Sequence, residues 1–373
     1  MDFLEKVYEA LGEEGLKKAR WKQKVMLIEY PLAVISEALY VGLWLFTPLG
    51  DWALRVSCQE GWPLFLKVLV YVGLFLFGSA LFGFPFSYLR RWVAIQTGTN
   101  RQSFGDWLVE WVKTTLLATG FYTLLFAEAY WLYLTNPRLA FWGAIVLAAL
   151  FVVAALFLSP VFFRMRYKTE PLEDPEKVQA IREVFEKAGV PFRGVSLARA
   201  SEKTTAGNAA VLPSRKGYEV VVFDTLLEAL DTDALKFVVA HELGHIRHRD
   251  ILKFAVVQSF SLALALIVGY LLAGSPKLEN FPLFYLGVIY TLYLIPFFSN
   301  AYSRKAEYAA DRYAIRLVPD LGAFERGFVV LYKQNILDPD PPAWYEALFY
   351  DHPSAKRRHE ALKKALDEIK GTA

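Results

Sequence analysis

The sequence predicts a mainly α-helical protein that crosses a membrane several times and carries a smaller polar α+β part with a short sheet. Of its 373 residues, 55% are hydrophobic and 16% are aromatic, a composition too apolar for an ordinary soluble domain. Six apolar stretches are long enough to cross a bilayer, which takes about 20 residues of helix. Two polar blocks, 166–250 and 301–373, contain all five histidines.

The predicted spans divide the chain into membrane and polar parts. The spans lie at about 26–47, 63–84, 112–135, 141–162, 252–274 and 282–299. The resulting parts are an N-terminal helix, a four-span region, a first polar part, a two-span hairpin and a second polar part, at 1–25, 26–165, 166–250, 251–300 and 301–373. The N-terminal helix either lies in the membrane interface or packs on the polar parts.

The distribution of Lys and Arg predicts the orientation. The segment before residue 26 carries six of them, and both polar parts are rich in them. The alternate loops carry one each, at Arg55, Arg138 and Lys277. Because basic segments stay on the cytoplasmic side, the N-terminus and both polar parts are predicted to be cytoplasmic. The acidic start lacks a charged-then-apolar signal, so we expect no cleaved leader.

Charge and cysteine content exclude several classes of protein. The net charge is only +3, so no basic excess calls for a nucleic-acid partner. The single cysteine, Cys58, excludes an internal disulfide and a cysteine metal cluster.

Three acids lie within the apolar stretches. An ionised group in lipid is costly, so Glu37 and Glu128 are predicted to face a water-filled interior. Glu29 lies nearer a span end and fits either the interface or the interior equally well.

The stretch "VVAHELGHIRHRD", 238–250, predicts a zinc-binding helix. His241 and His245 are four residues apart, so a helix presents both imidazoles on one face. Glu242 lies beside the first histidine, where it can act as general base in peptide hydrolysis. Asp231 or Thr232 can cap this helix. The motif also occurs by chance, but three histidines on one helix face fit scattered surface histidines poorly.

A third ligand is predicted in "SRKAEYAADRYA", 303–314. Glu307 and Asp311 share a helix face, and alone they read as a surface acid pair. Beside the histidine helix, Glu307 can complete the ligand set of one zinc per chain, and Asp311 can accept the second ring N–H of a ligand histidine. His248 is excluded as a ligand because it lies about 10 Å along the helix from His241, too far for two bonds near 2 Å.

The predicted metal centre lies near the membrane surface on the cytoplasmic side. The fifth span starts about seven residues after His245, and the Glu307 segment begins just after the sixth span. A membrane hairpin therefore joins the two halves of the centre.

Two short strands are predicted before the histidine helix. "GYEVVVFD", 217–224, reads as a buried strand because it is rich in β-branched residues. "GNAAVLP", 207–213, reads as an edge strand, since Pro213 tolerates an edge and not a sheet centre. An edge can pair with an extended peptide. Asn208 either adds an amide contact to that peptide or only shapes a turn after Gly207.

These segments resemble the integral-membrane zinc metalloproteases that include the type I CAAX prenyl endopeptidases and are related to bacterial heat-shock membrane metalloproteases. The similar segments are the histidine helix, the Glu307 segment, "GNAA" at 207–210 and "DHPSAKRRHEAL" at 351–362. "NRQSFG", 100–105, is most similar to the CAAX enzymes. The chain departs from that pattern in having six predicted spans where eukaryotic members have seven, and in having Ala210 where an aromatic residue is usual.

The resemblance implies both a fold and an activity. It implies a ring of membrane helices around a water-filled chamber, with a gluzincin-type catalytic domain at the cytoplasmic end. It also implies cleavage near the C-terminus of a prenylated protein, whose peptide lies along the edge strand at Asn208 and Ala209. In this reading, His352 stabilises the oxyanion and Arg358 orders the ligand acids.

Two alternatives to a CAAX-type protease stay open. One is a metalloprotease for quality control of membrane proteins. The other is a polytopic transporter or scaffold whose histidine motif is inactive. The expected partners are a peptide or protein substrate, prenylated in the first reading, and the lipid bilayer.

Overall fold

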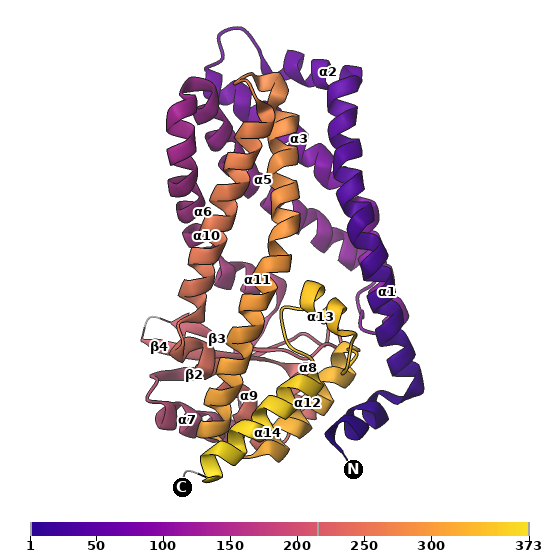
Figure 1. The fold of residues 1–373 in the computed structure, drawn as a ribbon, viewed down its shortest axis with the longest axis vertical. Helices are drawn as coiled ribbons and strands as arrows, with labels where there is room; N and C mark the ends of the chain where they lie inside the picture. Colours follow the sequence, from indigo (N-terminus) through magenta and orange to yellow (C-terminus); the bar gives the residue numbers. More distant parts are fainter. Residues whose placement is uncertain (1, 215, 372–373) are drawn as a thin grey trace.

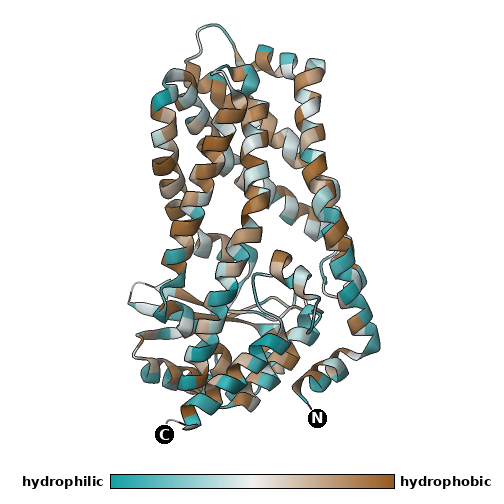
Figure 2. Cartoon of the chain, viewed as in Figure 1, coloured by the Kyte–Doolittle hydropathy of each residue, from teal (hydrophilic) through white to brown (hydrophobic). Residues whose placement is uncertain are grey.

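Long helices fill one end of the molecule, and a small sheet with shorter helices fills the other (Figure 1). The computed structural model describes residues 2–214 and 216–371. The long-helix end comprises α1 (Phe3–Phe46), α2 (Pro48–Ser57), α3 (Leu64–Phe82), α4 (Phe84–Thr97), α5 (Phe104–Thr135), α6 (Pro137–Arg166), α10 (Asp250–Ala273), η1 (Leu278–Asn280) and α11 (Phe281–Leu317). Figure 2 shows that these helices are mostly hydrophobic, whereas hydrophilic residues gather at the sheet end.

The sheet end is an α+β unit built from two separate stretches of chain. Its strands are β1 (Thr169–Pro171), β2 (Phe192–Ala198), β3 (Ala209–Ser214) and β4 (Gly217–Phe223). Its helices are α7 (Pro175–Ala188), α8 (Asp224–Ala229), α9 (Thr232–Arg247), α12 (Leu321–Asn335), α13 (Ala343–Phe349) and α14 (Ala355–Gly371). The α10–α11 hairpin separates the two stretches in sequence, and the lower part of α11 joins them in space.

The number of apolar spans differs from the prediction by one. Within the part of the chain described, five segments are long and apolar enough to cross a membrane: Phe3–Phe46, Leu64–Thr97, Pro137–Arg166, Asp250–Ala273 and Leu278–Leu317. The remaining predicted span, 112–135, lies in α5, a helix of 32 residues that packs against α3 and α6. Its threonines, tyrosines and Glu128 make it less apolar than the others.

The path of the chain indicates an even number of passes through the long-helix end. Both termini lie at the sheet end of the molecule (Figure 1), as an even number of passes requires. The chain is therefore a multi-pass integral membrane protein. Its mainly helical fold confirms the fold class predicted from the sequence.

A cavity of about 460 Å³ lies between α1, α3, α4, α5 and α11. Glu37 lines it and accepts a hydrogen bond of 3.1 Å from the Tyr285 hydroxyl, which lies 3.0 Å from Oγ of Ser79. Glu29 is buried nearby and pairs with Arg90 at 2.7 Å. Glu37 was predicted to face a water-filled interior, and its position in the wall of this cavity agrees with that prediction. Glu128 is exposed and is not among the residues that line the cavity.

The four-stranded sheet has the order β1-β2-β4-β3, which leaves β3 at one edge. β2 and β4 are parallel, and the other two pairs are antiparallel. β4 is central because its residues Val220, Val221 and Val222 are buried on both faces. β3 contains Pro213 and pairs only with β4 in the described chain, as predicted for an edge strand.

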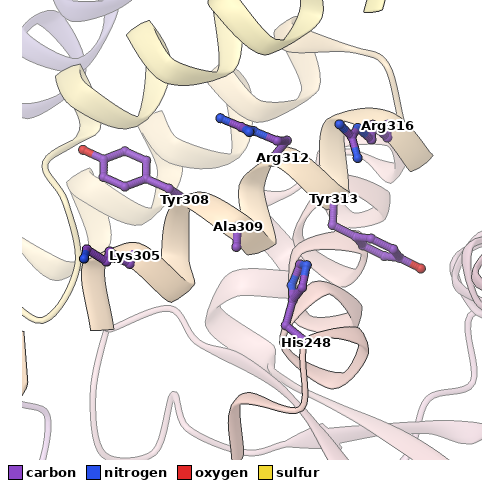
Figure 3. Close-up of a pocket in the computed structure, with 7 residues that line it drawn as sticks. All are labelled: His248, Lys305, Tyr308, Ala309, Arg312, Tyr313 and Arg316. Carbon is purple, nitrogen blue, oxygen red and sulfur yellow. The ribbon is translucent and has the colours of Figure 1, made fainter. Parts of the chain in front are cut away.

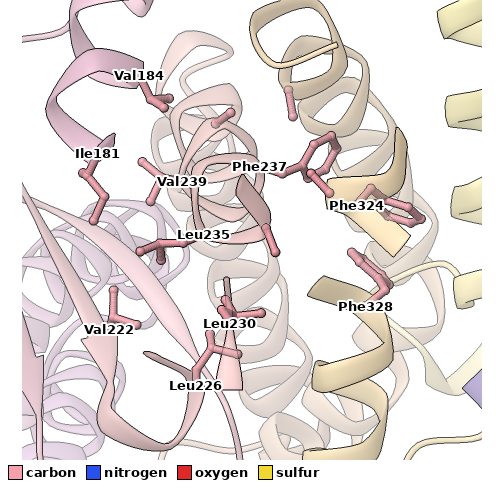
Figure 4. Close-up of a cluster of buried hydrophobic side chains, with 14 of the residues drawn as sticks. Ile181, Val184, Val222, Leu226, Leu230, Leu235, Phe237, Val239, Phe324 and Phe328 are labelled. Atoms are coloured by element: carbon pink, nitrogen blue, oxygen red, sulfur yellow. The ribbon is translucent and has the colours of Figure 1, made fainter. Parts of the chain in front are cut away.

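The core of the sheet end fixes the position of α9. Figure 4 shows Leu235 and Val239 of α9 facing Ile181 and Val184 of α7, while Phe237 faces α12. All of these side chains are buried. A helix held on two sides in this way can place a third face precisely against another element.

The N-terminal segment packs on the sheet end. Phe3, Val7 and Leu11 are buried in the same core, and the Phe3 ring stacks on His359 with 4.5 Å between centroids. Gly12, with φ of 66°, breaks α1 after this segment. A positive φ is unfavourable for residues with a Cβ, so glycine allows this bend. The N-terminal helix therefore packs on the polar part of the protein and does not lie in the membrane interface, which decides between the two predicted alternatives.

Candidate metal centre

Helix α9 presents His241 and His245 on its remaining face. Asp231 caps the helix by accepting a 2.8 Å hydrogen bond from the Ala234 amide, which realises one of the two predicted caps. The apolar residues of α9 face the core, so the two histidines are left to face α11.

Helix α11 brings the acidic residues to α9 by continuing past its apolar part. Glu307 and Asp311 lie one turn apart on it, and both are buried. The two helices cross where Gly244 meets Ala310. A Cβ built on Gly244 would lie 2.7 Å from Cα of Ala310, closer than side-chain atoms normally approach. The glycine in the histidine motif therefore allows the helix contact that closes the centre.

Three ligand atoms converge between the helices. Nε2 of His241 lies 3.2 Å from Nε2 of His245, and the two nitrogens lie 3.3 Å from Oε2 and Oε1 of Glu307, respectively. Donors about 2.1 Å from a tetrahedral zinc lie about 3.4 Å apart. Oε2 of Glu307 is also buried and, among the described residues, is approached only by ion-pair contacts that lack hydrogen-bond geometry. The three residues fit a metal ion.

Each histidine is held by a carboxylate through its other nitrogen. Nδ1 of His241 lies 2.9 Å from Oδ1 of Asp311, and Nδ1 of His245 lies 2.9 Å from Oδ2 of Asp250. If each Nδ1 donates its proton to the carboxylate, each Nε2 keeps a lone pair facing the shared point. Two such lone pairs and a carboxylate repel one another unless a cation lies between them.

Asp250 was missed as a site residue by the sequence analysis. It is the first residue of α10 and is 3% exposed. An acid at the very start of an apolar span calls for a specific partner, but nothing in the sequence shows that this partner is His245.

Arg358 on α14 ties the acidic residues together. It donates to both oxygens of Asp311, from Nε at 2.8 Å and from Nη2 at 2.6 Å, and its Nη1 lies 3.1 Å from Oε2 of Glu307. All three side chains are almost completely buried. A guanidinium bound at two oxygens in this way restricts the orientation of the carboxylate.

Glu242 follows His241 in the sequence and interacts electrostatically with the charged groups of the metal centre. Burial raises the pKa of the Glu242 carboxyl, and the nearby His241 and His245 partly offset this increase. Its side chain is partly exposed, so a substrate or water can reach it. A partly exposed carboxyl with a raised pKa is suited to taking up and returning a proton.

His352 enters the centre from the loop after α13. Its Nε2 lies 3.3 Å from Oε1 of Glu307, its Nδ1 lies 2.8 Å from Asp351, and more than half of its side chain is exposed. The backbone just before it is held by α11. Arg304 donates to the carbonyls of residues 346 and 350 at 3.2 and 2.6 Å, and Asn300 donates to that of residue 348 at 2.9 Å. Sequence reasoning gave no role to Arg304 or Asn300.

Asn208 and Ala209 lie apart from this cluster, at the start of the edge strand. The Asn208 side chain is exposed, and its Oδ1 accepts a 2.9 Å hydrogen bond from the Ala209 amide. β3 packs beside α9, so the edge runs next to the helix that carries the histidines. The structure thus gathers seven predicted residues in one centre and leaves these two at its border. The seven are His241, Glu242, His245, Glu307, Asp311, His352 and Arg358.

Comparisons with known proteins agree with this geometry. The model of "Peptidase family M48" matches residues 171–366. The chain is 26% identical to the "Uncharacterized metalloprotease YhfN" of Bacillus subtilis, over 80% of this chain and 74% of that protein. It is also 26% identical to "CAAX prenyl protease 1" of Saccharomyces cerevisiae, over 81% of this chain and 73% of that protein. The crystal structure of S. mikatae Ste24p superposes with a TM-score of 0.76 at 22% identity, over 94% and 89% of the two chains, which shows a shared fold.

The fold and the centre define a membrane-embedded metalloendopeptidase. The family match covers more than half of the sequence and includes every residue of the centre. The chain belongs to peptidase family M48.

Proposed function

We propose that the chain is a zinc endopeptidase that cleaves peptide bonds near the C-terminus of prenylated proteins at the cytoplasmic face of a membrane. The observation that carries the proposal is the His241–His245–Glu307 triangle, with Glu242 beside it. Two imidazoles and a carboxylate are the donor set of many zinc proteases.

The proposed mechanism assigns proton transfer to Glu242. When bound, zinc supplies a Lewis acid that polarises the peptide carbonyl and makes water a better nucleophile at neutral pH. Glu242 takes the proton of the attacking water and returns it to the leaving amine. His352, exposed and next to Glu307, donates a hydrogen bond to the oxygen that becomes negative in the transition state. Arg358 acts by holding Asp311 and Glu307.

The substrate peptide is proposed to bind along β3. The outer edge of this strand has unpaired backbone groups that an extended peptide can use. The Nδ2 group of Asn208 is available to a peptide carbonyl, since only Oδ1 is used by the Ala209 amide.

We expect Asn208→Ala to lower kcat/KM by about tenfold or more while zinc content and Tm stay unchanged, as the loss of a binding contact requires. Ser214→Ala, at the exposed far end of the same strand, is the matched control and should be silent. If Asn208→Ala lowers Tm while activity per folded molecule is kept, the residue only shapes the turn.

The prenyl group is supported by the relative named CAAX prenyl protease 1 and by the cavity between the membrane helices. Leu76, Phe126 and Leu292 give this cavity apolar surface that a lipid chain could cover, although its last residue on α11, Tyr293, precedes Glu307 by about 21 Å of helix.

The decisive experiment compares substrates for the zinc-loaded chain in lipid nanodiscs. A farnesylated C-terminal peptide should be cleaved much faster than its unprenylated twin or a casein-like protein. Equal cleavage of all three would favour the quality-control function over the proposed one. Absence of bound zinc would favour the inactive transporter or scaffold, whereas one zinc per chain that is lost when His241 is replaced would exclude it.

A further inference from the structure

A strongly basic groove lies on the side of α11 that faces away from the metal centre. Two adjoining hollows of about 360 and 530 Å³ share His248, Tyr313 and Arg316. We call their joint surface the basic groove and define it by Arg247, His248, Lys305, Arg312, Tyr313 and Arg316. Figure 3 shows the cationic side chains of α11 projecting from one side of the helix, with His248 of α9 below them.

The cations of the basic groove have no ion-pair partner among the residues that the structure describes. Arg247, Lys305, Arg312 and Arg316 are exposed, and in the described residues none of them forms an ion pair. Over residues 2–214 and 216–371, no acidic side chain lines the groove. The acids of this part of α11, Glu307 and Asp311, point to the other side and are used by the histidines and Arg358.

A cluster of cations without counter-charges is electrostatically unfavourable. Arg312 and Arg316 are four residues apart on one helix, and like charges at this spacing destabilise it. Nδ1 of His248 is buried and, in the part of the chain described, has no hydrogen-bond partner. A multivalent anion in the groove would offset the repulsion and could accept hydrogen bonds from several of these groups.

The position of the basic groove identifies the source of that anion. α10 begins at Asp250, directly after the groove residues Arg247 and His248, and its first turn exposes the apolar side chains of Ile251 and Leu252. On α11, Phe298 is 77% exposed, and Lys305 follows it by seven residues, about 10 Å along the helix. Acyl chains covering these apolar residues would bring a lipid headgroup to the mouth of the groove.

We propose that the basic groove binds the phosphate of an anionic membrane lipid. Lys305 and Arg312 provide charge-assisted donors at the side nearer the membrane, and Arg316 and Arg247 close the far side. A zwitterionic lipid carries its own cation and gains less from an all-basic site. The inference is independent of the proposed substrate, because the groove lies on the opposite side of α11 from Glu307.

The test is a binding measurement on the full, zinc-loaded chain. The detergent-solubilised protein is titrated with dioctanoyl phosphatidylglycerol, dioctanoyl phosphatidylcholine and inorganic phosphate, and adducts are counted by native mass spectrometry. We expect phosphatidylglycerol to bind at concentrations where the other two do not. Equal binding of phosphatidylcholine, or inorganic phosphate that competes as strongly as phosphatidylglycerol, overturns the lipid assignment.

The variant Arg312→Gln/Arg316→Gln removes two of the proposed contacts. We expect phosphatidylglycerol binding to weaken by about tenfold or more, because each basic residue near an anionic surface contributes strongly to attraction. Lys187→Gln/Arg193→Gln is the matched control, since it removes the same charge from exposed positions outside the groove. Both doubles should keep Tm and zinc content, since all four residues are exposed. An equal loss of binding in the control would reduce the effect to net charge and refute the site.

Discussion

At the scale of single residues, the metal centre depends on groups that do not bind the metal. Asp311 and Asp250 each bind the outer nitrogen of one histidine, and Arg358 holds Asp311 at both oxygens. These contacts leave His241 and His245 one orientation and one tautomer each. The two ligand histidines are supported from different elements, α11 for His241 and α10 for His245.

Asp250→Asn should weaken zinc binding by about 10–100-fold, the usual effect of losing a carboxylate behind a ligand histidine. Zinc affinity is measured by competition with a chelator. Asp233→Asn, at the opposite end of α9 and exposed, is the control. Unchanged affinity in Asp250→Asn would mean that the ring of His245 is held by packing alone.

Glu242→Gln should keep zinc and lose cleavage by a factor of about 10²–10⁴ or more, since the amide is nearly isosteric with the carboxylate but cannot take a proton. Metal analysis and a peptide assay check the two parts separately. Glu228→Gln, an exposed acid just before α9, should retain full activity. More than a few per cent of activity in Glu242→Gln would contradict its role as general base.

At the scale of elements, the centre exists because α9 and α11 cross in near contact at Gly244. Any side chain there must push the helices apart, because the atom it meets is the backbone of Ala310. The ligands come from both helices, so a wider crossing separates Glu307 from the histidines.

We therefore expect Gly244→Ala to reduce zinc affinity strongly and to destabilise the fold by about 1–3 kcal/mol, the range for overpacking a tight contact. Gly120→Ala is the matched control, because a Cβ at that helix position on α5 meets no atom within 4 Å. Tm and zinc affinity are measured for both. A Gly244→Ala protein with normal zinc affinity would show that the crossing can shift without cost.

The same elements show what could be predicted from sequence. The helix period alone places His241 beside His245 and Glu307 beside Asp311, so the ligand set could be predicted from spacing. The edge strand could be predicted from composition, because it contains Pro213. Asp250 was not accessible in this way, because α9 ends at Arg247 and Arg249 has a φ of 55°. That left-handed residue turns the chain back and returns the Asp250 carboxylate to His245. No periodicity encodes such a reversal, and the basic groove also arises only when α9 and α11 are packed together.

At the scale of the whole molecule, both termini lie at the sheet end, so both are expected in the cytoplasm. In a Cys58→Ser background, Glu9→Cys and Lys370→Cys place one exposed thiol near each terminus. An impermeant thiol reagent should label both in inside-out vesicles and neither in intact cells. Labelling of only one of the two in intact cells would mean an odd number of passes.

The α10–α11 hairpin also separates the two halves of the metal centre in the order of synthesis. His241 and His245 leave the ribosome before the hairpin, whereas Glu307, Asp311 and Arg358 leave it afterwards. Glu307 can reach the histidines only when both membrane helices have been inserted and paired. A chain that ends before this point has two ligands and no closed centre. The membrane hairpin is therefore part of the metal centre, because without it the third ligand never reaches the histidines.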